Sequence, residues 1–187
     1  MVQNRDNIKL EIIGALIRQP LHVRRIASQL SQSHSTIARA LIELEKENAV
    51  NSQIVGKNKL YSLKKNLTGK SYIFRAEYYK QGKLLKKYPL LEPILEDLLD
   101  KGKENILVLF GSYAKFTPKA DSDIDLYIET KNIKLKKELE KINSKLGIKI
   151  GELNPESVLI KEIIKNHIIL RGVEGFYEKT RFFKEIK

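Results

Sequence analysis

Cysteine is absent from this sequence of 187 residues. Without cysteine the chain can form neither a disulfide framework nor a zinc site with thiolate ligands. No apolar run approaches the roughly 18 residues that a membrane-spanning helix needs. The first residues also lack the basic-then-apolar order of a signal peptide. We therefore expect a cytoplasmic protein that makes no contact with a membrane.

Negative charge is scarce relative to positive charge. The chain carries 35 lysine and arginine residues against 23 aspartate and glutamate residues, a net charge of +12. A basic chain favours polyanionic partners, because binding them releases counterions. The excess is spread evenly, with +4 in each of residues 1–62, 63–102 and 103–187. Charge alone therefore leaves nucleic-acid binding and a generally lysine-rich composition equally open.

Apolar residues at helical spacing predict three short helices near the N-terminus, followed by a β-hairpin. Ser33 is a good N-cap for the third helix, and Asn48 can end that helix in the left-handed conformation. The predicted helices cover about 8–17, 23–30 and 34–47, and the predicted strands cover 50–55 and 60–63.

This order of elements resembles a winged helix-turn-helix domain, which we assign to residues 1–65. In that family the third helix enters the major groove of DNA. The resemblance implies DNA contacts from the third helix and from the tip of the hairpin, through His34, Ser35, Thr36, Arg39, Lys57 and Lys59. Many winged helices serve only as protein–protein or dimerisation modules, so DNA binding and homodimer formation both stay open.

Residues 66–102 are predicted to form a linker and a helical connection. The stretch 71–75 is compatible with a short strand or with the start of a helix. Pro93 suits the first turn of a helix that Gly102 closes.

The C-terminal part, residues 103–187, contains two polar motifs beside apolar strands. An apolar run over 106–110 predicts a buried strand, and Gly111-Ser112 follows it directly. Farther on, Asp123 and Asp125 lie in a second predicted strand, where residues two apart point to the same side. Two adjacent carboxylates repel each other unless a cation lies between them. Mg²⁺ prefers oxygen ligands of this kind, and the Gly-Ser turn offers backbone N–H groups to a phosphate.

The combination of these motifs, in this order, resembles the nucleotidyltransferase superfamily. It is most similar to the minimal nucleotidyltransferases that act as antitoxins paired with HEPN toxins. The resemblance implies a mixed α/β domain with a small sheet, in which Gly111 and Ser112 hold a nucleoside triphosphate such as ATP. It also implies that Asp123 and Asp125 are catalytic and coordinate Mg²⁺.

A third carboxylate normally comes from the next strand in that family, and here no acid occupies its position. The predicted strand covers 148–153, and the family's aspartate falls on Gly151. Glu152 is the acid nearest to that position, and a bulge at Gly151 would turn it toward the pair. Either Glu152 completes the catalytic set, or the domain binds nucleotide with poor catalysis.

These observations favour an α+β protein with two domains. The leading hypothesis is a Mg²⁺-dependent enzyme that transfers AMP from ATP to an acceptor such as a protein, including a HEPN-type toxin. The alternative is a transcription regulator that senses nucleotide without turnover. A third alternative is a dimeric scaffold that uses neither site.

Overall fold

The computed structural model describes residues 2–103 and 106–183. Contacts divide the chain into two compact units, residues 1–79 and residues 80–187. Each unit combines helices with one small sheet, in agreement with the predicted α+β class. Among the described residues, no helix is both long and apolar enough to cross a membrane.

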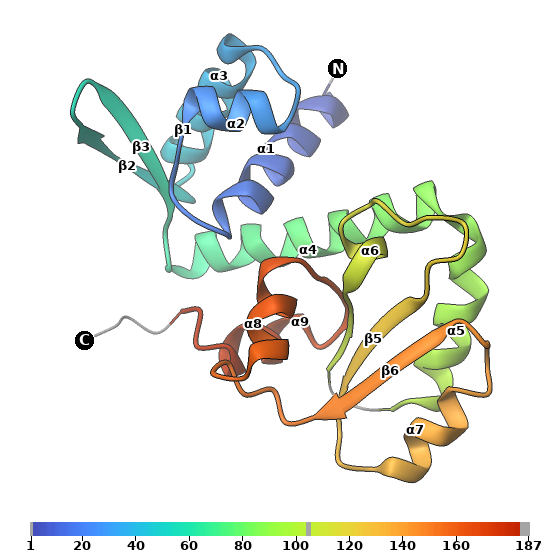
Figure 1. Cartoon of the computed structure of the whole chain (residues 1–187). Coiled ribbons are helices and arrows are strands. Elements are labelled where there is room, and N and C mark those ends of the chain that lie inside the picture. The colour runs from blue at the N-terminus through green and yellow to red at the C-terminus, as the bar shows by residue number, and fades with distance from the viewer. Residues whose placement is uncertain (1, 104–105, 184–187) are drawn as a thin grey trace. The chain divides into compact units, whose positions relative to one another are not determined.

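The first unit is a group of helices followed by a projecting β-hairpin (Figure 1). The short strand β1 pairs with β3, which also pairs with β2. The elements are α1 (Val2–Leu16), β1 (Leu21–His22), α2 (Val23–Gln29), α3 (His34–Lys46), β2 (Val50–Val55) and β3 (Asn58–Leu63).

Two predicted helix boundaries in this unit are confirmed. The Ser33 hydroxyl accepts the backbone N–H of Thr36 at 3.1 Å and caps α3. Asn48 has a φ of 63°, the left-handed conformation that stops the helix before the hairpin. The elements follow the order expected of a winged helix-turn-helix domain, although that resemblance stays a prediction.

A buried lysine joins α1 to α3. Lys9 is 8% exposed, and its Nζ lies 2.7 Å from an oxygen of Glu47 and 2.9 Å from an oxygen of Glu43. The hydroxyl of Tyr72 donates a hydrogen bond to the other oxygen of Glu47. Burial alone would lower the pKa of Lys9, but its two carboxylate partners outweigh burial and raise that pKa well above its usual value.

The segment 66–102 is largely helical. Helix α4 (Leu67–Lys87) begins where a linker was expected, so the strand interpretation of 71–75 was wrong. The side chain of Asn66 accepts the N–H of Gly69 at 2.8 Å, which supplies a partner at the helix start. The short helix η1 (Pro89–Leu91) and α5 (Glu92–Lys101) follow, and α5 ends at Gly102 as predicted.

The second unit is built on a four-stranded mixed sheet with the order β6-β5-β4-β7. Strand β4 pairs antiparallel with both β5 and β7, whereas β5 and β6 run parallel. The elements are β4 (Leu107–Leu109), α6 (Gly111–Ala114), β5 (Ile124–Glu129), α7 (Ile133–Leu139), β6 (Leu146–Gly151), α8 (Val158–Lys165), β7 (Ile168–Arg171) and α9 (Val173–Lys179).

The two faces of this sheet have different chemistry. One face carries Ile124, Leu126 and Ile128, which belong to one hydrophobic core with the leucines of α5. Alternation turns Asp125, Tyr127 and Glu129 to the other face. Figure 1 shows α5 and the pair α8 and α9 on opposite sides of the sheet.

The region between β5 and β6 differs from the prediction. Helix α7 ends at Leu139, and β6 begins at Leu146, whereas the strand was predicted to begin at residue 148. The side chain of Asn143 accepts the N–H of Lys145 at 2.9 Å, and its carbonyl accepts the N–H of Leu146 at 3.1 Å. Because of this turn, β6 begins two residues before the predicted strand. This start determines which residues of β6 lie beside the aspartates.

Candidate functional site

The two aspartates lie at the start of β5. Asp125 is the second residue of the strand and is partly buried, whereas Asp123 is exposed just before the strand. Ile124 and Leu126 are at most 2% exposed on the opposite face. The alternation of apolar and acidic side chains therefore orients the carboxylate of Asp125, whereas Asp123 precedes the strand.

Gly111 lies directly against the carboxylate of Asp125. The backbone N–H of Phe110 donates to the carbonyl oxygen of Asp125 at 2.9 Å, which continues the pairing of β4 with β5. Gly111 follows with a φ of +70°, and a Cβ at this position would overlap a carboxylate oxygen of Asp125. Only glycine combines this conformation with so close an approach. The fold thus brings Gly111-Ser112 and Asp125 together.

The electrostatics of Asp125 are unfavourable in the absence of a cation. Burial raises the pKa of Asp125, the negative charge of Asp123 raises it further, and the positive charge of Lys149 lowers it. A divalent cation between the carboxylates would remove this repulsion. Within residues 2–103 and 106–183, no three His, Asp or Glu side chains form a group that could hold a metal.

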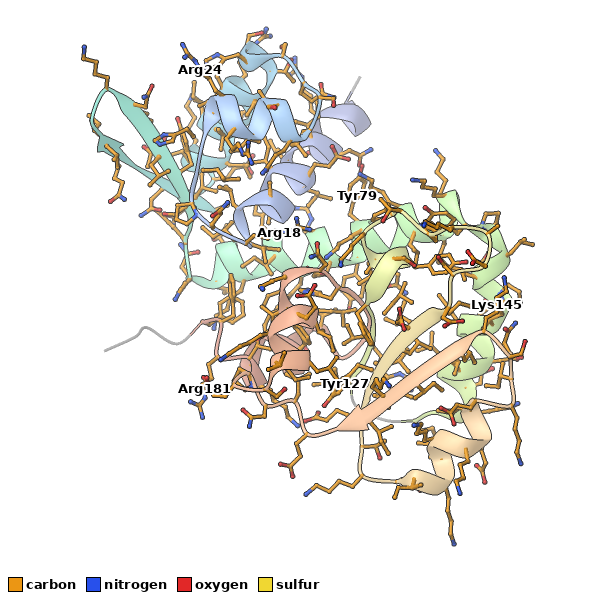
Figure 2. The ribbon with its side chains drawn as sticks, in the orientation of Figure 1. Arg18, Arg24, Tyr79, Tyr127, Lys145 and Arg181 are labelled. Atoms are coloured by element: carbon orange, nitrogen blue, oxygen red, sulfur yellow. The ribbon has the colours of Figure 1, made fainter. Side chains whose placement is uncertain are left out.

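Hydrogen bonds and an aromatic contact fix the loop between Ser112 and Asp123 near both of its ends. The Ser122 hydroxyl accepts the N–H of Lys119 at 2.8 Å. Lys145, labelled near the start of β6 in Figure 2, donates to the carbonyl of Ala120 at 2.9 Å. At the other end, the ring of Phe116 stacks on Tyr88 with centroids 6.4 Å apart. Sequence reasoning missed these supporting residues, because no motif connects positions so far apart.

Comparison with known proteins bears on this unit. Residues 94–172 match the family model described as "Polymerase beta, Nucleotidyltransferase". Over this segment the chain is similar to nucleotidyltransferases. No curated protein and no solved structure matches the chain. The matched segment contains β4, α6, β5 and β6, and therefore the whole of the site built around Asp125.

The nucleotidyltransferase-like domain does not bring Glu152 to the aspartate pair. In the parallel register of β5 and β6, Asp125 lies opposite Gly147, and Gly151 lies opposite Glu129. At roughly 3.3 Å per residue, that is roughly 13 Å farther along the sheet. Glu152 follows Gly151 and forms an ion pair with Lys131. The register of β5 and β6 is regular as far as Gly151, without the predicted bulge that would turn Glu152 toward the pair.

A buried tyrosine lies between the aspartates and this far end of the sheet. Tyr127 is 2% exposed, and within the described part of the chain its hydroxyl has no hydrogen-bond partner. Burial, followed by the charges of Glu129 and Glu152, raises the pKa of Tyr127 to about 12. The tyrosine is therefore neutral at physiological pH.

His167 has a structural role at the end of α8. It is 3% exposed, and its Nδ1 donates to the carbonyl oxygens of Ile163 at 2.9 Å and Ile164 at 3.1 Å. These carbonyls are among those that a helix C-terminus leaves without an intrahelical partner. His167 therefore supplies a hydrogen-bond donor to the carbonyl groups at the C-terminal end of α8.

The N-terminal unit contains a basic hollow of about 670 Å³ beside the hairpin. His22 lines it, and its Nδ1 donates to the carbonyl of Lys59 at 2.8 Å. The described residues that line this hollow include no acidic one; they are His22, Val23, Arg24, Arg25, Ser28, His34, Lys57, Asn58, Lys59 and Tyr61. Figure 2 shows Arg24 extending outward from α2.

The six residues predicted to contact DNA lie in three different places on the N-terminal unit. His34, Lys57 and Lys59 line the basic hollow. Thr36 and Arg39 line a smaller hollow of about 280 Å³ between α1 and α3, together with Glu43. The remaining residue, Ser35, has its hydroxyl 3.0 Å from that of Ser33 in the α3 cap. Sequence reasoning missed Arg24 and Arg25, which only the fold of α2 against the hairpin brings to the hollow.

Proposed function

We propose that the C-terminal domain binds a nucleoside triphosphate with Mg²⁺ and transfers the nucleotidyl group to an acceptor hydroxyl. The supporting observation is the pair Asp123 and Asp125 beside the close turn of Gly111-Ser112. Two carboxylates fit Mg²⁺, which usually takes one or two carboxylates and completes its shell with phosphate oxygens and water. With ATP as the donor, the transferred group is AMP.

The proposed reaction is a displacement at the α-phosphorus. The acceptor oxygen forms a bond to this phosphorus while the bond to the bridging oxygen of pyrophosphate breaks, and the proton of the acceptor passes to solvent. Asp123 and Asp125 would hold the ion, and the backbone at Gly111 and Ser112 would bind phosphate oxygens. When bound, Mg²⁺ supplies positive charge that neutralises the triphosphate and orients it for in-line attack.

The acceptor class that we favour is a protein hydroxyl. This choice follows from the similarity of the Gly-Ser and Asp-x-Asp motifs to antitoxins that are paired with HEPN toxins. The test is label transfer from α-³²P-ATP in the presence of Mg²⁺, with purified protein and lysate of the source cells. Label on an acceptor with the wild type, and none with Asp123→Asn/Asp125→Asn, is the expected result. If the double variant labels the acceptor equally, the assigned site is wrong.

A second candidate function is a DNA-binding regulator that senses nucleotide. Two observations favour it, the basic hollow beside the hairpin and the ion pair that engages Glu152 with Lys131. Without a third carboxylate, the transfer step would be slow, and the nucleotide would stay bound without being consumed. We would measure the affinity of the protein for duplex DNA by fluorescence anisotropy, with and without Mg²⁺ and ATP. An affinity that changes with nucleotide supports a sensor, whereas equal affinities contradict it.

A homodimer is proposed for DNA binding, since DNA-binding helix-turn-helix domains often act as dimers on two half-sites. Gel filtration with light scattering tests this at the concentrations used for DNA binding. A molecular mass of twice the 21.6 kDa chain is expected. A mass of one chain, free and bound to DNA, would exclude the dimer.

A further inference from the structure

The strand β6 presents a lysine to the aspartate pair. Strands β5 and β6 are parallel and in register, with Asp125 opposite Gly147 and Tyr127 opposite Lys149. Ile148 belongs to the hydrophobic core on the opposite face of the sheet. Alternation therefore turns Gly147 and Lys149 to the face of Asp125. They are the two residues of β6 nearest to Asp125 on this face.

Lys149 is within reach of ligands bound at the pair. With strands about 4.8 Å apart and a rise of about 3.3 Å per residue, the Cα atoms of Lys149 and Asp125 are roughly 8 Å apart. The positive charge of Lys149 lowers the pKa of Asp125, which places the two groups in one electrostatic neighbourhood. Gly147 adds no side chain between them, and a Cβ there would lie 3.2 Å from an oxygen of Asp125.

The charges farther along the sheet are already engaged with one another. Lys179 lies 2.6 Å from a carboxylate oxygen of Glu129, and Lys131 forms an ion pair with Glu152. Lys149, in contrast, is exposed and forms no ion pair within residues 2–103 and 106–183. Its ammonium group is thus available to an anion that enters beside Asp125.

The charge balance of the site depends on this lysine. Asp123, Asp125 and Lys149 together carry a charge of −1, since two carboxylates are offset by one ammonium group. A single divalent ion is enough to make this set positive, as binding a triphosphate requires. A second divalent ion would be bound only weakly, because the ammonium group of Lys149 lies beside the carboxylates and repels another cation.

We propose that Lys149 binds phosphate oxygens of the nucleotide in place of a second divalent ion, so that the site takes a triphosphate with one metal ion. This inference rests on the proposed nucleotide binding at Asp123 and Asp125. A lysine ammonium is a compact point charge with three hydrogen-bond donors, and it binds phosphate well. Lys149 is then a nucleotide-binding residue of the domain, supplied by a strand from which a carboxylate was expected.

The test counts metal ions and measures affinity without requiring turnover. A non-hydrolysable ATP analogue is titrated calorimetrically in Mg²⁺, and bound Mn²⁺ per nucleotide is counted by electron paramagnetic resonance. We compare the wild type with Lys149→Gln, Lys149→Arg and Lys149→Asp. The control Lys137→Gln removes an equal charge from an exposed position on α7. Because Lys149 is exposed, its variants should fold like the wild type, and thermal unfolding distinguishes a loss of folding from a loss of binding.

The expected wild-type result is one Mn²⁺ per bound nucleotide. Lys149→Gln should weaken nucleotide affinity roughly tenfold or more, as expected for loss of a charge-assisted contact. Lys149→Arg should keep most of the affinity, Lys137→Gln should match the wild type, and Lys149→Asp should bind a second ion. Two ions in the wild type, or equal affinity in Lys149→Gln, would overturn the inference while leaving nucleotide binding intact. No nucleotide binding by the wild type would overturn the proposed function as well.

Discussion

The backbone of Gly111 and the carboxylate of Asp125 occupy adjoining space that leaves no room for a Cβ at residue 111. The contact joins the end of β4 to the start of β5, two strands that are neighbours in the sheet. It explains physically why a glycine follows the apolar strand. It also connects the two halves of a motif that are separated by a loop in the sequence.

Gly111→Ala should destabilise the second unit by about 1–3 kcal/mol, because alanine at a φ of +70° is strained and its Cβ would displace Asp125. Nucleotide binding should fall with it. Urea denaturation followed by circular dichroism measures the first effect. Gly82→Ala is the control, since Gly82 lies in α4 and a Cβ added there would have nothing within 4 Å. That change should be neutral or stabilise by up to about 1 kcal/mol. Equal losses in both variants would contradict the assignment.

Asp125→Asn should make the protein without metal more stable at neutral pH. The pKa of Asp125 is raised in the folded protein by burial and by Asp123. For a carboxyl group with a raised pKa, stability falls as pH rises from the unfolded pKa, 3.8, through the folded one. The variant should lose this dependence. Thermal unfolding between pH values of about 3.5 and 7 measures this dependence. The same pH profile in the variant and the wild type would show that the pKa of Asp125 is not raised in the folded protein.

The same Asp125→Asn variant should lose stabilisation by Mg²⁺. A ligand that binds only the folded state raises the unfolding temperature by mass action. We therefore expect Mg²⁺ with a non-hydrolysable nucleotide to raise the midpoint of the wild type and to leave the variant unchanged. Glu152→Gln serves as the comparison, because Glu152 is engaged by Lys131 at the far end of β6. A loss in Glu152→Gln equal to that in Asp125→Asn would show that Glu152 takes part in binding the metal and nucleotide.

Lys9→Met should destabilise the first unit by about 1 kcal/mol or less, since Glu47 loses its cationic partner but its side chain is 40% exposed and stays solvated. Burial would raise the pKa of Glu47, but hydrogen bonds from Lys9 and Tyr72 outweigh this and lower it. Stability from this carboxylate is present above its unfolded pKa, 4.5, and is lost as pH falls through the folded value. Acid titration of unfolding measures the loss, which should be smaller in Lys9→Met. Lys46→Met, an exposed change on α3, should match the wild type.

Arg24→Ala/Arg25→Ala should weaken binding to duplex DNA and reduce its salt dependence. Each phosphate contact contributes about 0.9 to the slope of log affinity against log salt, so loss of two contacts should lower the slope by about 1.8. Arg18→Ala/Lys46→Ala removes the same charge from exposed positions outside the hollow. Equal slopes in the two double variants would mean that the hollow is not the DNA site.

Arg39→Ala distinguishes the two hollows of the N-terminal unit. Arg39 lies with Glu43 in the smaller hollow and apart from the basic one. If α3 enters the major groove, as the winged-helix resemblance implies, this variant should weaken DNA binding more than Arg18→Ala does. Anisotropy titrations at one salt concentration measure the difference. Equal affinity for both variants would remove Arg39 from the interface.

Most local elements and the composition of the site could be predicted from the amino-acid sequence. Ser33 and Asn48 define the ends of α3 through side-chain hydrogen bonding and left-handed backbone, effects that act within a few residues. Alternation of apolar and acidic residues orients Asp125, because side chains in a strand alternate strictly between faces. The start of α4 was one exception, because the polar stretch from Lys64 to Lys70 resembles a linker, and only the hydrogen bond between Asn66 and Gly69 shows the helix start.

What lies opposite those aspartates, in contrast, depends on the folded chain. Because of the turn at Asn143, β6 begins at Leu146. The parallel register then places Gly147 beside Asp125, and Glu152 lies farther along, where it forms an ion pair with Lys131. Strand register depends on pairing between distant segments, and a shift by a few residues changes which side chain meets a site. For the same reason Arg24 and Arg25 could be assigned to the basic hollow only from the packing of α2 beside the hairpin.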